Sequence, residues 1–377
     1  MNSAIRDKLF ALVRLGMGLN TPLPDVTSEE CKEILQIAKR HSILPVVHQG
    51  LKISRAPDEF FKEADNALAK AVFQVLQQED AMKRVGNALD SAGIPYIPLK
   101  GLILRKLYPR PDMRTSSDID VLVREEELEH AVREIEQHAG FKAIKHNYHD
   151  VSMIDSRVHL ELHFSIKENM ENIDALLMKA WGYVLPSQNS CRKEFTSEFQ
   201  LFHVIAHMSY HMVHGGLGIR PFLDLWLLRN KSGYGEKTLR GMCEECNILK
   251  FYEKSCSLVN SWMSGVQVDA SLKQFEEFCL NGGVFGSSET VMASKQRTKR
   301  GISYLWGRVF MSREKLETEY PELKQKPYLL PSRQIKRWSR LLSKEKRTQA
   351  RQELKDVREL DSKVVESFDE LLISLGL

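Results

Sequence analysis

The sequence predicts an α+β protein in which a small mixed β-sheet is embedded in helical N- and C-terminal regions. Two observations predict this class. Between residues 91 and 168, short apolar or alternating segments replace the helical periods found on either side. These segments follow the order strand, helix, strand, helix, strand and hairpin, which favours a compact sheet with helices on one face. We therefore expect four regions, at residues 1–90, 91–168, 169–300 and 301–377.

Residues 1–90 have the pattern of helices. Thr27 is followed three residues later by Glu30, which is a capping-box signal at a helix N-terminus. Ile34, Ile37 and Ala38 then repeat at helical spacing. A later helical period reaches Gly93, which we expect to end it as a C-terminal cap.

Residues 91–168 contain the segments expected to form the sheet. Asp155-Ser156 is expected to be the turn of the hairpin, because strand-like segments flank it on both sides. Segments 102–108 and 124–140 are expected to be helices that separate the strands. The expected strands are IPYIPLK (94–100), SDIDVLV (117–123), FKAIKHN (141–147) and the two arms of the hairpin, VSMI (151–154) and RVHLELHFSI (157–166).

Residues 169–300 return to a helical pattern, which continues into the basic region 301–377. His203, His207 and His211 recur every four residues and share one helix face. They could hold a metal, line a substrate cleft, or form a polar stripe packed on the sheet. Segment 332–351 has eight Lys or Arg residues against one Glu and an apolar stripe. It could bind a membrane surface or a nucleic acid, but we favour docking of the stripe on the protein itself.

Composition indicates an ordinary globular protein. The chain has 377 residues, of which 42% are hydrophobic and 28% are charged, and its net charge of +4 by itself implies no nucleic-acid partner. No stretch approaches 18 consecutive apolar residues, and the N-terminal apolar patch LFALV has no cleavage site after it. We therefore expect neither a transmembrane segment nor a signal peptide, and a cytoplasmic location.

The six cysteines are scattered, so reduced thiols are expected. Cys243 and Cys246 have metal-ligand spacing, but no second pair completes a site and the pattern around them is helical. We interpret them as ordinary helix residues, with a metal or redox role as the alternative.

Two carboxylates occupy one face of an expected strand. Side chains alternate along a strand, so Asp118 and Asp120 point one way while Ile119, Val121 and Val123 point into the core. Two like charges this close are costly unless a cation lies between them. Mg²⁺ meets that need, because it takes oxygen ligands and commonly binds one or two carboxylates together with substrate phosphates. The alternative is a solvated strand face.

A second strand repeats this arrangement. His159, Glu161 and His163 share one face of RVHLELHF, opposite the apolar residues. If this strand lies beside the first, Glu161 joins Asp118 and Asp120 in one cluster. Three carboxylates on adjacent strands can hold two metals that clamp the attacking and leaving oxygens of a phosphoryl or nucleotidyl transfer.

Phosphate-binding candidates precede these carboxylates. Lys100 and Gly101 lie where a strand passes into a helix, and glycine there lets backbone N–H groups approach a phosphate. Lys100 could add a point charge, and Arg114 could bind phosphate oxygens through two donors. Ser116 and Ser117 could donate hydrogen bonds. Ordinary loop structure is the alternative for all of these residues.

These residues resemble a known family. The stretch PLKGLILRKLYPRPDMRTSSDIDVLV (98–123) is similar to the uncharacterised nucleotidyltransferase family of the DNA polymerase β-like superfamily. ILQIAKRHSILPVVHQGL, RVHLELHFSI and the segments FHVIAHMSYH and GIRPFLDLWLL extend the resemblance over most of the chain. The resemblance implies a nucleotidyltransferase core in which Asp118, Asp120 and Glu161 bind Mg²⁺ or Mn²⁺, and in which Gly101 marks the nucleotide-phosphate loop.

The chain departs from the wider superfamily in one respect. The superfamily usually has a Gly-Ser pair close to its Asp-x-Asp motif, whereas Leu102 follows Gly101 here and sixteen residues separate Gly101 from Asp118. Lys100 and Arg114 are our candidates to replace the missing serine. His163 and His207 are expected to line the cleft.

We therefore expect a metal-dependent enzyme with a two-metal-ion mechanism. It would transfer a nucleoside monophosphate from a nucleoside triphosphate such as ATP to an unidentified acceptor, with release of pyrophosphate. A small-molecule acceptor is favoured. The alternatives are transfer to RNA or protein, docked by the basic C-terminal region, and a non-catalytic nucleotide-binding or scaffold protein.

Overall fold

The computed structural model describes residues 1–54, 61–185, 190–231, 233–283, 327–334 and 362–377, and the single residues 290, 294, 316 and 323. Residues 335–351, which carry most of the basic segment, lie outside the described part of the chain. The expectation that this segment docks on the protein therefore stays a prediction.

Five strands form one mixed sheet in the order β1-β2-β5-β4-β3. β2 and β5 are parallel neighbours, and the other neighbouring strands are antiparallel. The α+β class with a small mixed sheet is thus confirmed, and β4 and β5 flank the expected turn at Asp155-Ser156. The strands are β1 (Tyr96–Pro98), β2 (Asp118–Val123), β3 (Lys142–His146), β4 (Asp150–Ile154) and β5 (His159–His163).

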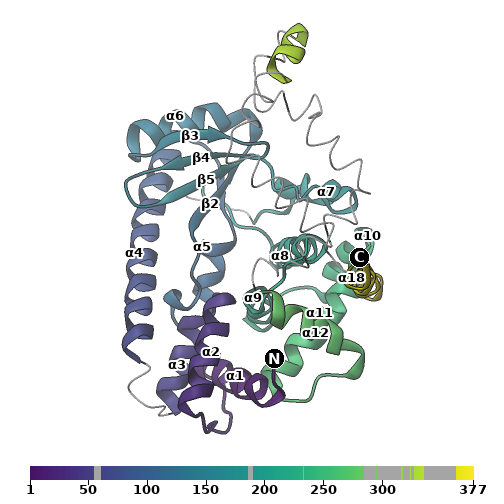
Figure 1. Cartoon of the computed structure of the whole chain (residues 1–377). Helices are drawn as coiled ribbons and strands as arrows, with labels where there is room; N and C mark the ends of the chain where they lie inside the picture. Colours follow the sequence, from purple (N-terminus) through teal and green to yellow (C-terminus); the bar gives the residue numbers. More distant parts are fainter. Residues whose placement is uncertain are drawn as a thin grey trace.

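One face of the sheet is apolar and packs against two helices. α4 (Phe61–Ser91) and α6 (Leu128–His138) contribute Val85, Leu89 and Ile135 to a core shared with Ile119 and Val121. All five side chains are fully buried. In Figure 1 these helices flank the sheet on its outer side. Because alternate strand residues point in opposite directions, this packing leaves the polar residues of β2 and β5 on the other face.

Helices before and after the sheet share a second core. α1 stacks on α11, where the rings of Phe10 and Trp262 have centroids 4.6 Å apart, and α18 stacks on α12 through Phe368 and Phe278. Figure 1 shows α1, α2 and α3 beside α9, α11 and α12, below the sheet. The helices are α1 (Ser3–Gly16), α2 (Ser28–Arg40), α3 (Leu44–Ser54), α7 (Glu171–Leu177), α8 (Ser197–Val213), α9 (Ile219–Lys231), α10 (Glu236–Glu245), α11 (Leu249–Ser264), α12 (Lys273–Gly282) and α18 (Ser362–Leu375).

The predicted capping box is confirmed, and the structure places the two cysteines of the CEEC motif. α2 begins with the expected capping box, because the Thr27 hydroxyl accepts from the Glu30 N–H and Glu30 accepts from the Thr27 N–H. Cys243 and Cys246 are buried free thiols at the end of α10. Burial raises the pKa of both thiols, that of Cys246 to about 11, which favours the protonated thiol. Their interpretation as ordinary helix residues stays a prediction.

Among the described residues, none of the helices combines the length and the apolar character that a membrane span requires.

Short elements connect β1 to β2. α5 (Lys100–Leu104) starts two residues earlier than the expected helix and gives way to a 3₁₀ turn at Arg105–Leu107, followed by another at Pro111–Met113. The N–H of Leu99 bonds the carbonyl of Asp120 at 2.9 Å. This bond fixes the start of α5 beside the carboxylates of β2.

Candidate functional site

The parallel pairing of β2 and β5 brings the three predicted carboxylates together. Asp120 lies opposite Glu161 in the strand register, and Asp118 lies on the same face of β2. All three side chains line a cavity of about 670 Å³ between the sheet and helices α8 and α9. The condition set from the sequence, that the strand carrying Glu161 lies beside the strand carrying Asp118 and Asp120, is met.

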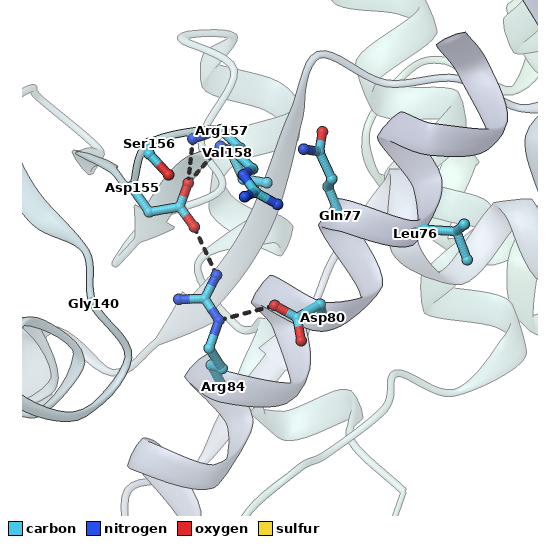
Figure 2. A pocket seen from close by; sticks show the side chains of 9 residues that line it. All are labelled: Leu76, Gln77, Asp80, Arg84, Gly140, Asp155, Ser156, Arg157 and Val158. Carbon is cyan, nitrogen blue, oxygen red and sulfur yellow. Dashed lines mark hydrogen bonds and ion pairs between the residues drawn. The ribbon is translucent and has the colours of Figure 1, made fainter. Parts of the chain in front are cut away.

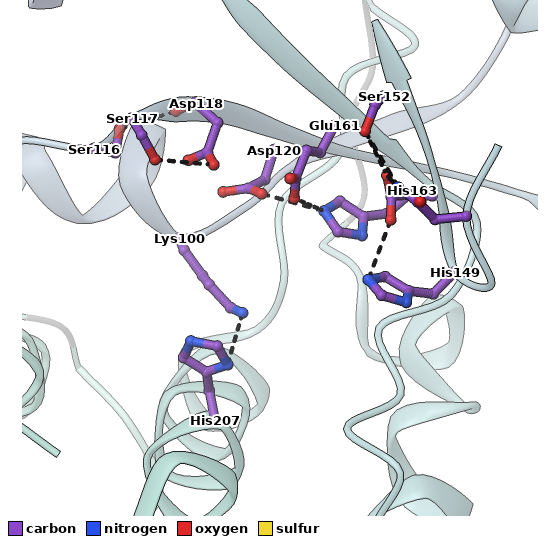
Figure 3. A network of polar contacts seen from close by, with 12 residues as sticks. Lys100, Ser116, Ser117, Asp118, Asp120, His149, Ser152, Glu161, His163 and His207 are labelled. Carbon is purple, nitrogen blue, oxygen red and sulfur yellow. Dashed lines mark hydrogen bonds and ion pairs between the residues drawn. The ribbon is translucent and has the colours of Figure 1, made fainter. Parts of the chain in front are cut away.

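His163 lies between two of these carboxylates. Its Nε2 is 3.2 Å from Asp120 Oδ1 and 3.5 Å from Glu161 Oε2 (Figure 3). Burial alone would lower the pKa of His163, but the hydrogen bonds to Asp120 and Glu161 raise it to about 9. In the same way burial raises the pKa of Asp120, and the contact with His163 more than offsets this and holds it at about 2. A protonated imidazole therefore neutralises part of the cluster.

The ionised form of Asp118 is disfavoured by its surroundings. Burial, and then the neighbouring charges of Asp120 and Glu161, raise the pKa of the Asp118 carboxyl. Ser117 donates a hydrogen bond to Asp118 Oδ2 at 3.1 Å and so orients this carboxylate. Ligand atoms of Asp118, His159 and Glu161 lie within 4.8 Å of one another, as do those of Asp120, Glu161 and His163. The crowded carboxylates thus fit a hard divalent cation, which would relieve the repulsion that Asp118 experiences.

Lys100 connects this wall of the cavity to the opposite one. Its backbone φ is +28°, which is uncommon for a residue with a side chain and typical of positions held in place by a functional site. The Lys100 ammonium extends away from the carboxylates to His207 on α8, where Nζ is 3.0 Å from Nδ1 (Figure 3). His207 is thus among the residues that line the cavity.

Glu168 organises the opposite wall. Its Oε1 lies 2.7 Å from His207 Nδ1 and 3.8 Å from Lys100 Nζ. Burial would raise the pKa of Glu168, but the contacts with His207 and Lys100 lower it strongly, so the carboxylate is ionised. Burial and Lys100 lower the pKa of His207, and burial and His207 lower that of His211 to about 3. The wall therefore consists of an anionic glutamate, a cationic lysine and neutral imidazoles.

The metal interpretation of the α8 histidines gains no support. Within the part of the chain that the structure describes, no group of three potential ligands contains His203, His207 or His211. His203 is buried beside Phe195, and burial lowers its pKa well below the ordinary value. The position of His207 fits the interpretation as a cleft-lining residue. The position of His203 fits the interpretation as part of a polar stripe packed inside the protein.

Glycine is required at position 101 because the side chains of Ser116 and Arg114 lie very close to its backbone. The expected role in a phosphate-binding loop is not needed to explain it. A Cβ atom built on Gly101 would lie 2.9 Å from Ser116 Oγ and 3.1 Å from Arg114 Nη1. The glycine thus lets α5 pack directly against the loop that precedes Asp118. Because α5 has only five residues, it offers little helix dipole for an anion.

Buried arginines fix this loop. Arg105 is 2% exposed and donates to the Gly101 carbonyl at 3.0 Å, to Gln78 Oε1 at 2.6 Å and to Ser116 Oγ at 3.0 Å. No carboxylate among the described residues lies within ion-pair distance of Arg105, and burial, followed by the charge of Arg114, lowers its pKa to about 10. This buried cation is therefore held by neutral groups of α4, α5 and the loop, and its burial without a carboxylate has an energetic cost.

Arg114 is also engaged with the protein. Its Nε and Nη2 donate to the two oxygens of Asp224 on α9 at 3.2 and 3.0 Å, and Tyr108 donates to the same carboxylate at 2.8 Å. The Nη1 group lies beside Gly101. Arg220, on the same helix as Asp224, lines the cavity and donates to the Thr115 carbonyl at 3.1 Å. Arg114 therefore anchors the loop to α9, with one amino group left toward the cavity side.

Another cavity, of about 540 Å³, lies between α4 and the β4–β5 turn (Figure 2). Arg84 pairs there with Asp155 at 2.6 Å and with Asp80 at 3.1 Å, and also donates to the Ala139 carbonyl. Asp155 in turn accepts from the N–H groups of Arg157 and Val158. These polar groups pair with one another and stabilise the turn. We therefore interpret this cavity as part of the structural framework and not as a reactive site.

A protein-family model described as uncharacterised nucleotidyltransferase matches residues 27–264 of the chain. The chain belongs to this family. Searches of curated proteins and of solved structures give no match. As a member of a nucleotidyltransferase family, the protein is assigned to the transferases, and a nucleoside triphosphate is the substrate that the family implies. The matched segment contains the whole sheet, the three carboxylates and both walls of the cavity.

Two residues near the cavity, Glu168 and Arg105, were not predicted from the sequence. Glu168 follows β5 in a segment without periodicity, and Arg105 falls inside an apolar stretch. Neither Glu168 nor Arg105 belongs to a sequence pattern that predicts a place in a functional site. Only the folded chain places Glu168 against His207 and Arg105 behind Gly101.

Proposed function

We propose that this nucleotidyltransferase uses Asp118, Asp120 and Glu161 to hold Mg²⁺ or Mn²⁺ and transfers a nucleoside monophosphate to an acceptor. The observation that carries the proposal is the convergence of three carboxylates from two parallel strands on one cavity. Bound there, the metals would neutralise charge on the triphosphate and on the attacking and leaving oxygens. The acceptor oxygen would bond to the α-phosphorus as the bond to the β-phosphate breaks and pyrophosphate leaves.

The chain's own residues would position the triphosphate. Ser117 supplies a hydroxyl at Asp118, and Lys100 supplies a cation on the opposite wall of the cavity, where it contacts His207. Gly101 lets α5 lie close to the loop that precedes Asp118. Arg114 offers Nη1, because its Nε and Nη2 donate to Asp224. His163 would keep its hydrogen bond to Asp120 and line the cleft beside the metals.

A small-molecule acceptor remains favoured. The cavity of about 670 Å³ has the size of a site for a nucleotide and a small second substrate. Transfer to RNA or protein would need a docking surface, and the basic segment 332–351 is the candidate for it. Radiolabel from a nucleoside triphosphate that appears in RNA or in protein would favour that alternative.

The direct test is nucleotide binding with and without Mg²⁺. We expect Asp118→Asn/Asp120→Asn to lose the Mg²⁺-dependent part of the binding. The matched control is Glu125→Gln/Glu127→Gln, which removes two carboxylates at the same spacing from an exposed 3₁₀ turn. Unchanged metal-dependent binding in the aspartate variant would contradict the site assignment. Tight binding without turnover of any nucleotide would favour a non-catalytic protein.

A further inference from the structure

Beside the carboxylates, His163 also belongs to a second cluster of ligand atoms, in which His149 and Asp150 have no role in the proposed function. His149 precedes β4, Asp150 begins it, and Asp150 lies opposite His163 in the strand register. One ligand atom from each of the three residues lies within 4.8 Å of the other two. Figure 3 shows His149 on the side of His163 away from Asp118. The cluster therefore consists of two imidazoles and one carboxylate.

The Asp150 carboxylate is held in a fixed orientation. Asn147 Nδ2 donates to Asp150 Oδ2 at 2.8 Å, and Ser152 Oγ donates to the same oxygen at 3.4 Å. The other oxygen, Oδ1, is 3.2 Å from His149 Nε2. Asp150 is only 2% exposed. A buried carboxylate with one oxygen anchored and the other directed at an imidazole is arranged as metal-ligating carboxylates are.

His163 is oriented in a complementary way. Its Nε2 faces Asp120, and its Nδ1 is buried with no hydrogen-bond partner among the described residues. Metal-ligating histidines typically donate one ring N–H to a carboxylate while the other nitrogen binds the ion. A buried ring nitrogen without a partner is unfavourable in the protein alone. A bound cation would displace the proton from Nδ1 into solvent and take its lone pair, while Nε2–H stays on Asp120.

The donor set selects the type of cation. Imidazole nitrogen suits zinc and related transition metals, whereas Mg²⁺ prefers oxygen alone. With metal–ligand bonds near 2.0–2.1 Å, the ligand atoms of a tetrahedral zinc site are about 3.3 Å apart. The separation of 3.2 Å between His149 Nε2 and Asp150 Oδ1 matches that spacing. His149 is 42% exposed, so an ion can reach the cluster from solvent.

We propose that His149, Asp150 and His163 bind a zinc-class divalent cation, at a site distinct from the Mg²⁺ site of Asp118, Asp120 and Glu161. Water would fill the fourth position. Because His163 also contacts Asp120, an ion bound here would hold the His163 ring beside the carboxylate cluster. The proposal needs no nucleotide and no acceptor.

The test is equilibrium dialysis of the full chain against Zn²⁺, with excess Mg²⁺ present to occupy the oxygen-only site. Co²⁺ provides a second readout, because tetrahedral coordination by nitrogen gives visible absorption. We expect the wild type to retain one equivalent of Zn²⁺, and His149→Ala and Asp150→Asn to weaken its binding at least tenfold. His130→Ala is the matched control, since His130 is also 42% exposed and lies 3.5–3.6 Å from two carboxylates.

The outcomes separate this site from its neighbour and from adventitious surface binding. Wild-type-like Zn²⁺ binding by His130→Ala and by Asp118→Asn, together with loss in His149→Ala, would support the proposal. Absence of Zn²⁺ from the wild type, or full binding by His149→Ala, would overturn it. Equal loss in His130→Ala would mean surface binding, and loss in Asp118→Asn would mean that zinc binds the carboxylates instead. Each of these results is independent of whether nucleotide binding requires Mg²⁺.

Discussion

The buried ion pair between Arg114 and Asp224 ties the loop before Asp118 to α9, and its removal should be costly. The two side chains are 8% and 5% exposed, and Asp224 accepts hydrogen bonds at 2.8, 3.0 and 3.2 Å. Asp224→Ala would leave the Arg114 guanidinium buried without its carboxylate. Breaking one side of a buried pair costs about 3–5 kcal/mol. We expect the free energy of unfolding to fall by about that amount.

Urea denaturation, followed by circular dichroism and tryptophan fluorescence, measures this loss. The control is Glu253→Ala, which removes the partner of Arg240 from an exposed pair whose N–O distance is 2.5 Å. Exposed pairs contribute only about 0–1 kcal/mol. A third variant, Arg114→Met/Asp224→Leu, should be more stable than Asp224→Ala, because it leaves no unpaired buried charge.

Two results would refute this reasoning. Asp224→Ala could cost no more than Glu253→Ala, which would mean that water or another group readily compensates Arg114. Alternatively, the double variant could be less stable than Asp224→Ala, which would mean that the packing of these side chains matters more than their charges. Either result would also weaken the view that Asp224 holds the loop in place for Asp118.

Two further predictions concern the loop and the cluster. Gly101→Ala should destabilise the protein by about 1–3 kcal/mol in urea denaturation, because its methyl group would clash with Ser116. Gly241→Ala, in a helix with open space around the new Cβ, should instead be stabilising, so equal effects of the two substitutions would exclude the clash. The raised pKa of His163 predicts a stabilising contribution that is fully present below pH 6.5 and is lost as pH rises through about 9. Thermal unfolding between pH 6 and 10 should show a smaller alkaline loss in His163→Gln than in the wild type, and parallel profiles would contradict the role of Asp120 in raising that pKa.

The carboxylate cluster could be predicted from the sequence because its signals are local. Alternation along β2 and β5 assigns Asp118, Asp120 and Glu161 to the polar faces, and the apolar residues between them require burial on the opposite face. The sequence did not show whether the two strands are neighbours, and the folded structure shows that they pair in parallel. A single-residue shift in register would have separated Asp120 from Glu161, and alternation within one strand does not determine that register.

The contacts around the cluster could not be predicted, because they join residues far apart in the chain. The position of Arg114 beside Asp-x-Asp favours a phosphate ligand, yet its main partner is Asp224, 110 residues away. Glu168 meets His207 across 39 residues, and His149 meets His163 only through the pairing of β4 with β5. In each case the side chain has several chemically reasonable partners, and the tertiary packing selects one of them.

The most direct measurement of the central claim is a crystal structure with Mn²⁺ and a nucleoside triphosphate analogue whose α–β bridge cannot be cleaved. The proposal predicts anomalous manganese density about 2.0–2.3 Å from carboxylate oxygens of Asp118, Asp120 and Glu161, with the α-phosphate bound to the same ions. Manganese elsewhere, or a triphosphate bound in the cavity without contact to these three residues, would contradict it.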